Sequence, residues 1–209
     1  MKLYYAAGAC SLASHIALIE SGLPHTIAKV DLRKHTLEDG SDYYAINPKG
    51  YVPLLELDDG TKLAEGVVIL QYIADRVPGK LAPEYGTLER YRVMEWLTFV
   101  NSEVHKQFSP LFYPTTPDAT KEAQKTKLAS RFEYLSKVLQ SQPYLAGDKF
   151  TIADAYLFTI LNWAPNLKVD LSPFPALVAY QERVRARPSV QRAMTLEGLV
   201  KPEAAKATA

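Results

Sequence analysis

The strand-forming segments of this chain all lie in its first 65 residues, and this asymmetry sets the fold. Residues 1–5 favour β-structure, and residues 26–32 alternate apolar and polar side chains as a half-exposed strand does. "YVPLLEL" and "TKLA", joined by an Asp-Gly turn, predict a β-hairpin at 51–64. Residues 11–20, between the first two strands, carry apolar side chains at helical spacing. The chain therefore begins with a β-α-β unit.

The remaining segments up to residue 80 complete an α/β domain. The polar residues 33–50 are typical of a loop or a short helix. After the hairpin, Glu65 and Gly66 open a helix that "PGK" closes. We expect the order β-α-β-α-β-β-α for residues 1–80, with a right-handed β-α-β unit.

Beyond "PGKLAPEYG" no segment has the pattern of a strand. The proline and glycine content of that stretch is typical of a linker, placed at 81–86, and residues 87–209 are predicted to be all-helical. One helix begins near Thr87. The apolar face of another is marked by Leu128, Phe132, Leu135 and Leu139.

The most apolar helix is predicted in "FTIADAYLFTILNWA". Thr151-x-x-Asp154 is a capping-box pattern, with Phe150 placed as a hydrophobic staple. A helix that is apolar nearly all round belongs at the centre of a bundle. Pro175 suits the first turn of a further helix, which "ARPSVQRAM" breaks and restarts, and residues 201–209 are predicted to form a disordered tail.

The charge balance argues against a polyanionic partner. Lys plus Arg number 24 and Asp plus Glu 23, so neither nucleic acid nor an anionic membrane surface is expected. The N-terminus lacks a long apolar segment, and no stretch approaches the length of a membrane-spanning helix. We expect a soluble, cytoplasmic protein, and a single cysteine agrees with a reducing compartment.

Cys10 is the only cysteine, and it lies where the first strand gives way to a helix. The unpaired N–H groups and partial positive charge of a helix N-terminus lower the pKa of a thiol, which favours a reactive thiolate. A free cysteine can equally be a small buried apolar residue. Because no second cysteine can resolve a mixed disulfide, redox chemistry at Cys10 would need an external thiol.

Two further features are compatible with peptide binding. Pro53 interrupts a clean strand, so it lies at an edge, at a strand start or in a cis turn, and a cis turn would free the backbone of Val52 to pair with an extended peptide. Glu65 precedes a helix whose N–H groups can bind a carboxylate while Glu65 receives an ammonium group, although capping explains Glu65 as well. With Cys10, these features suit a short thiol peptide, and glutathione fits.

Four segments, "YYAAGACSLASHIAL", "NPKGYVPLLELDDGTKLAEGVVILQYIAD", "EVHKQFSPLF" and "FTIADAYLF", resemble the bacterial beta-class glutathione S-transferases, in this order and over essentially the whole chain. The resemblance implies a thioredoxin-like N-terminal domain, an all-helical C-terminal domain and a homodimer. It also implies glutathione as co-substrate and no metal.

The resemblance implies roles for particular residues of the first domain. Cys10 looks like the cysteine that faces the glutathione sulfur and can form a mixed disulfide with it. Val52, before a cis Pro53, resembles the residue that pairs with the cysteinyl backbone of glutathione. Glu65 with Gly66 resembles the γ-glutamyl anchor, but Gly66 stands where many glutathione transferases have a serine, so only its backbone N–H can bind the carboxylate.

Other residues are implicated by the same resemblance. His105 would otherwise be interpreted as structural, but with Lys106 it looks like the pair that approaches the thiol from the helical domain. Either Lys34 or His35 would bind the glycyl carboxylate. The pocket for the electrophile would be lined by Tyr5, Phe108, Phe112, Tyr113 and Trp163.

The sequence thus predicts a glutathione transferase that conjugates the glutathione thiolate to electrophilic, mostly hydrophobic small molecules. Cys10 and His105 would hold the sulfur and shift it toward thiolate. Thiol-disulfide exchange or reductive dehalogenation through Cys10 is a second expected activity. The alternative is a noncatalytic ligand- or partner-binding protein on the same fold, which has no physical need for Cys10, Val52 and Glu65 together.

Overall fold

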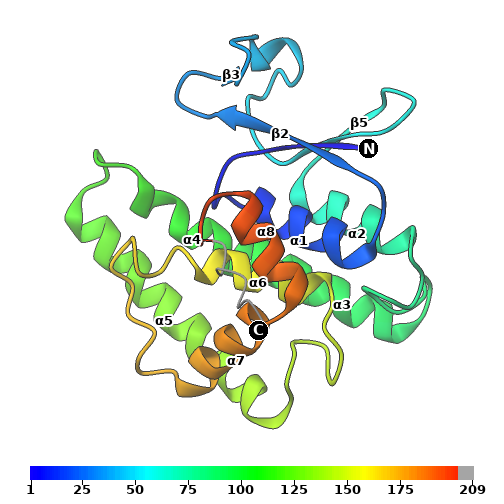
Figure 1. Cartoon of the computed structure of the whole chain (residues 1–209). Helices are drawn as coiled ribbons and strands as arrows, with labels where there is room; N and C mark the ends of the chain where they lie inside the picture. The colour runs from blue at the N-terminus through cyan, green and yellow to red at the C-terminus, as the bar shows by residue number, and fades with distance from the viewer. Residues whose placement is uncertain (202–209) are drawn as a thin grey trace, which may run out of the picture.

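The computed structural model describes residues 1–201, and its strands form one five-stranded sheet near the N-terminus (Figure 1). The strand order is β3-β2-β1-β4-β5. β1 and β2 are parallel, whereas the other neighbours are antiparallel. The strands are β1 (Lys2–Tyr5), β2 (Thr26–Asp31), β3 (Thr36–Leu37), β4 (Leu54–Glu56) and β5 (Lys62–Ala64).

The two α-helices within the first 80 residues lie between this sheet and the helices that follow (Figure 1). α1 (Ser11–Ser21) packs on both α6 (Ile152–Leu161) and α8 (Pro188–Leu196), and α2 (Gly66–Asp75) also contacts α6. The other helical elements are α3 (Leu88–Phe99), the π-helix η2 (Val100–His105), α4 (Lys106–Phe108), the 3₁₀ turn η3 (Ser109–Phe112), α5 (Asp118–Ser141) and α7 (Pro175–Arg185). None of the helices in residues 1–201 has the length and apolarity to cross a membrane.

The architecture confirms the predicted sheet and hairpin before residue 65 and the helices after it. The placement of the linker at 81–86 stays a prediction. Of the predicted tail at 201–209, all but Lys201 lies outside the described residues.

The segment 33–50, predicted to be a loop or a short helix, forms a short strand and a short 3₁₀ helix. The second helix of the first domain is only a 3₁₀ turn, η1 (Tyr43–Ala45), after the short strand β3. Here the side chain of Asp42 accepts a hydrogen bond from the N–H of Tyr44 at 2.9 Å. Short polar side chains that bind nearby backbone groups favour turns over longer helices. The strand predicted at 26–32 ends at Asp31, and Leu32 beyond it is exposed.

The capping box of α6 is confirmed, and it is buried. The N–H and hydroxyl of Thr151 donate to Asp154 Oδ2 at 2.8 and 2.9 Å. The N–H of Leu145 and the hydroxyl of Tyr180 donate to Asp154 Oδ1 at 2.9 and 3.1 Å. Every residue of α6 is buried, and helices from both halves of the molecule pack on it. The carboxylate of Asp154 therefore sets the start of a central helix.

We expect Asp154→Ala to lower the free energy of unfolding by about 3 kcal/mol, because it leaves buried backbone N–H groups without acceptors. Urea denaturation of the purified protein measures the change. Asp148→Ala, at an exposed carboxylate in the preceding loop, is the matched control and should change stability by less than about 0.5 kcal/mol. Equal effects of the two substitutions would contradict this account.

Candidate functional site

Cys10 occupies the N-cap position of α1, and the loop before it is held from the helical domain. The N–H of Gly8 donates to Glu197 Oε2 at 3.0 Å. The carbonyl of Gly8 accepts a hydrogen bond from Trp163 Nε1 at 2.8 Å. Glu197 is in turn paired with the buried His15 at 2.9 Å. The C-terminal half of the chain therefore fixes the backbone that leads into the cysteine.

The thiol of Cys10 faces the turn before β4. Its Sγ donates to the carbonyl of Val52 at 3.3 Å, and the Val52–Pro53 peptide bond is cis. Pro53 thus takes the cis alternative and lies directly before the strand. Among the described residues no acceptor binds the N–H of Val52. The thiol and a free backbone donor are therefore close together.

Of the two alternatives left open for Cys10, the structure favours the partly buried neutral thiol over the thiolate. The thiol is half-buried, and burial raises the pKa of Cys10 to about 11. The backbone N–H groups of Cys10 and Ser11 and the charge of Lys106 lower this pKa, as expected for a helix start, while Glu65 raises it. Desolvation is the largest effect, so the group is a neutral thiol at neutral pH.

Glu65 occupies the N-cap position of α2, but its side chain does not cap the helix. Its side chain makes no cap hydrogen bond, and its backbone has a φ of 68°, a conformation uncommon outside glycine. Instead, Lys49 Nζ lies 3.0 Å from Glu65 Oε1, and both side chains are exposed. Lys49 was missed because "NPKG" indicates only a turn. A Cβ built on Gly66 would lie 3.6 Å from Pro53 Cγ, so the start of α2 adjoins the cis-proline turn.

His105, at the end of η2, is bound to α6. Its Nδ1 lies 2.6 Å from the hydroxyl of Tyr156, which in turn donates to Asn101 Oδ1 at 3.0 Å. Burial, and then the charge of Lys106, lowers the pKa of His105 to about 4, so its imidazole is neutral at neutral pH. No pattern in the sequence singled out Asn101 or Tyr156 as functional. A tyrosine in an otherwise apolar helix does need a polar partner, and that was the available signal.

Some of the residues predicted around the electrophile gather at His105. The ring of Trp163 is 4.9 Å from that of His105 and 5.1 Å from that of Phe112, measured between centroids. Phe108 also contacts Trp163 but is fully buried, so it has no surface to offer. Tyr113 is exposed, whereas Tyr5 is buried beside His15 in the core, which argues against a role for Tyr5 in that pocket.

Of the two predicted ligands of the glycyl carboxylate, His35 packs closer to the cis-proline turn. Its ring lies 4.4 Å from that of Tyr44, and a Cβ on Gly50 would come within 2.9 Å of its Nδ1. Gly50 leads directly to Val52. Lys34 is exposed on the β2–β3 turn, where its N–H donates to Asp31. The choice between Lys34 and His35 stays a prediction.

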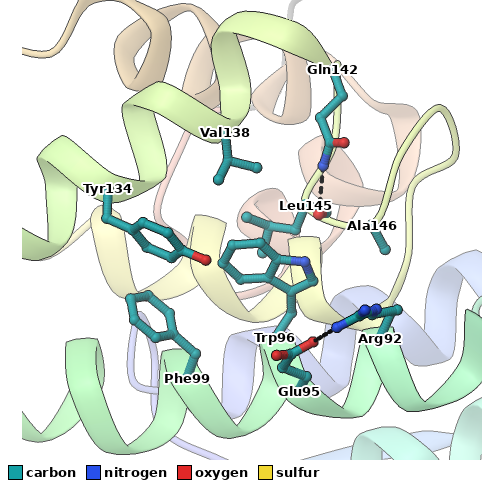
Figure 2. A pocket seen from close by; sticks show the side chains of 9 residues that line it. All are labelled: Arg92, Glu95, Trp96, Phe99, Tyr134, Val138, Gln142, Leu145 and Ala146. Carbon is teal, nitrogen blue, oxygen red and sulfur yellow. Dashed lines mark hydrogen bonds and ion pairs between the residues drawn. The ribbon is translucent and has the colours of Figure 1, made fainter.

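A groove of about 390 Å³ lies elsewhere, between α3 and α5 (Figure 2). Its aromatic wall comprises Trp96, Phe99 and Tyr134, with the rings of Trp96 and Tyr134 stacked at 5.8 Å. Arg92 and Glu95 form an ion pair at its rim. None of the predicted site residues lines this groove, so it is separate from the surroundings of Cys10. In residues 1–201, no cluster of three or more His, Cys, Asp or Glu side chains is placed to hold a metal ion.

A thioredoxin-like sheet with a cysteine facing a cis-proline turn, packed on a helical domain, defines a thiol-binding protein of the glutathione transferase architecture. The family model for the glutathione S-transferase N-terminal domain matches residues 7–76, and that for the C-terminal domain matches residues 96–188.

Individual relatives agree with the family models. Glutathione S-transferase GstA of Escherichia coli O157:H7 is 49% identical over 95% of this chain and 100% of its own length. A sphingomonad glutathione S-transferase, solved in complex with glutathione, is 44% identical with a TM-score of 0.91 over 96% of this chain and all of the other. The bacterial beta-class enzyme of Sphingomonas chungbukensis is 47% identical, with a TM-score of 0.92 and the same coverage of both chains. The chain therefore belongs to the bacterial glutathione S-transferase family.

The raised pKa of Cys10 predicts how the rate of its alkylation by iodoacetamide depends on pH. With a pKa of about 11, only about 0.1% of the thiol is ionised at pH 8, so the rate should rise about tenfold per pH unit up to pH 9.5 without levelling. Mass spectrometry of the alkylated protein gives the rate, and an unstructured cysteine peptide is the control. A plateau below pH 8 would show that the helix start outweighs burial.

Proposed function

We propose that this protein is a glutathione S-transferase that joins the glutathione sulfur to electrophilic, mostly hydrophobic small molecules. The convergence of Cys10, the free N–H of Val52 and the start of α2 at Glu65 carries this proposal. Together these groups match the thiol, the extended backbone and the charged γ-glutamyl end of one short peptide. The names of its relatives, including one solved with bound glutathione, support the same function.

Each part of the site has a chemical partner in glutathione. The N–H of Val52 pairs with the cysteinyl backbone, with Pro53 holding the turn. The carboxylate of Glu65 receives the γ-glutamyl ammonium group, and the unpaired N–H groups at the start of α2, including that of Gly66, bind the adjoining carboxylate. Lys34 or His35 binds the carboxylate at the glycyl end.

The reaction requires the glutathione thiol to lose its proton and its sulfur to attack the electrophile. A carbon–sulfur bond forms, and the leaving group departs with the bonding electrons, or an activated double bond accepts them. His105, neutral at neutral pH, accepts a hydrogen bond from the thiol, and the ammonium group of Lys106 favours the thiolate. Phe112 and Trp163 hold the apolar part of the electrophile.

The protonation of Cys10 favours conjugation over thiol-disulfide exchange. A neutral thiol beside the glutathione sulfur can donate a hydrogen bond to its thiolate, whereas a second thiolate would repel it. Exchange and reductive dehalogenation through Cys10 need the cysteine itself as nucleophile. We therefore propose these as the slower activities of this site.

We also propose a homodimer in the cytoplasm, on the basis of the resemblance to the beta class. Light scattering after gel filtration tests the oligomeric state, because a dimer has twice the chain mass of 23.3 kDa.

The first test is a calorimetric titration with reduced glutathione, followed by turnover with an activated chloronitrobenzene. We expect His105→Ala to lower kcat/KM by about 100-fold and Cys10→Ala by about tenfold, since one removes a proton acceptor and the other a hydrogen-bond donor to a charged sulfur. His25→Ala is the histidine control. Glutathione binding without turnover would support the noncatalytic alternative, and full activity in both site variants would refute the assigned roles.

A second test uses the departure at Gly66. The helical backbone there accepts a side chain, because a Cβ would meet Pro53 only at ordinary contact distance. Gly66→Ser should tighten glutathione binding about fivefold, the value of about 1 kcal/mol for one added hydrogen bond. Gly66→Ala adds the same Cβ without the hydroxyl, so an equal gain in both variants would mean that no hydrogen bond to the γ-glutamyl carboxylate is made.

A further inference from the structure

The side chain of His105 is the end of a short chain of hydrogen bonds. Its Nδ1 lies 2.6 Å from the hydroxyl of Tyr156, and that hydroxyl lies 3.0 Å from Asn101 Oδ1. Tyr156 is only 2% exposed. Asn101 and His105 are four residues apart on η2, and η2 contacts α6, which carries Tyr156. Two helical elements therefore hold all three polar groups in a row.

The number of available protons sets the direction of these hydrogen bonds. The tyrosine hydroxyl has one proton, and Asn101 Oδ1 can only accept, so this proton points to Asn101. The hydroxyl oxygen must then accept from His105, which places a proton on Nδ1. Because a neutral imidazole carries a single ring proton, Nε2 keeps a free electron pair.

The surroundings maintain this arrangement. Burial is the largest of the effects that raise the pKa of Tyr156, so its hydroxyl keeps the proton. The ring of His105 packs edge-on against Trp163, whose indole N–H donates to the carbonyl of Gly8 in the loop before Cys10. The imidazole is thus bound to Tyr156 of α6 and packs on the side chain that anchors that loop.

We propose that Tyr156 and Asn101 are positioning residues, which fix His105 with its proton on Nδ1 so that Nε2 accepts the proton of the glutathione thiol. This inference rests on the proposed function of the site. The thiol S–H bond breaks, its electron pair stays on sulfur, and the proton moves to Nε2. The resulting imidazolium keeps its Nδ1–H hydrogen bond to the tyrosine, and because burial and Lys106 disfavour the charged ring it returns the proton to the leaving group or to water.

The direction of the chain is essential to this role. If Asn101 could not accept, Tyr156 would donate its proton to Nδ1 instead. The ring proton would then lie on Nε2, and the same histidine in the same position could no longer accept a proton from the thiol. A substitution at Asn101 therefore changes the chemistry of His105 through two hydrogen bonds.

The test combines kinetics with ¹⁵N NMR of the histidine rings of this protein. The sequence has four histidines, so few ring signals have to be assigned. In the native protein we expect the proton of His105 on Nδ1. In Asn101→Leu we expect it on Nε2, with kcat reduced about 100-fold and the KM for glutathione within about twofold of the native value. Asn101→Asp retains an acceptor and should retain the Nδ1 proton and most of kcat.

Two further variants separate this role from a merely structural one. Tyr156→Phe removes the hydroxyl from the chain, and we expect a mixture of both tautomers of His105 with an intermediate kcat. Ser102→Ala changes the neighbouring exposed side chain, whose hydroxyl donates to the carbonyl of Thr98, and should leave both readouts unchanged.

A native protein with the proton on Nε2, or Asn101→Leu with native kcat, would overturn the proposal. If the native protein has no glutathione-dependent turnover, the proposed function fails instead. The NMR spectra then still decide whether Asn101 and Tyr156 set the tautomer, because they do not depend on turnover.

Discussion

The geometry around Cys10 depends on the two hydrogen bonds that hold the backbone of Gly8. One comes from Trp163 at the end of α6, and the other goes to Glu197 just after α8. Gly8 has a φ of 70°, and a Cβ there would lie 3.2 Å from Leu199, so the position suits glycine on both counts. The cysteine lies between β1 and α1, but side chains from the helical half determine where it lies.

The same packing sets the protonation states of the site. Burial raises the pKa of Cys10 to about 11 and lowers that of His105 to about 4, so both side chains are uncharged at neutral pH. A site of this kind offers one neutral donor and one neutral acceptor to a sulfur that becomes an anion. In the proposed reaction, neither Cys10 nor His105 then adds a negative charge beside the developing thiolate, and the positive charge of Lys106 opposes the negative charge of Glu65.

Local patterns predicted the fold well and the site only in part. The Asp-Gly hairpin and the capping box of α6 were predicted because neighbouring residues determine them. The placing of Cys10 beside Val52 in one site followed from the resemblance, because local patterns do not bring together residues that are 42 positions apart. The protonation state of Cys10 stayed open because a helix start is visible in sequence whereas desolvation is not. The pairing of Glu65 with Lys49 depends on tertiary structure in the same way.

The ion pair between Lys49 and Glu65 has a consequence for how a zwitterion enters the site. In the proposed function, the ammonium group of the ligand reaches Glu65 and replaces the ammonium group of Lys49. An exposed pair of this kind contributes at most about 1 kcal/mol, so little free energy is lost in the exchange. The released side chain of Lys49 would then be free to attract a carboxylate of the incoming peptide. Recognition of this proposed kind is an ion exchange, in which selectivity comes from matching both charges of the ligand end at once.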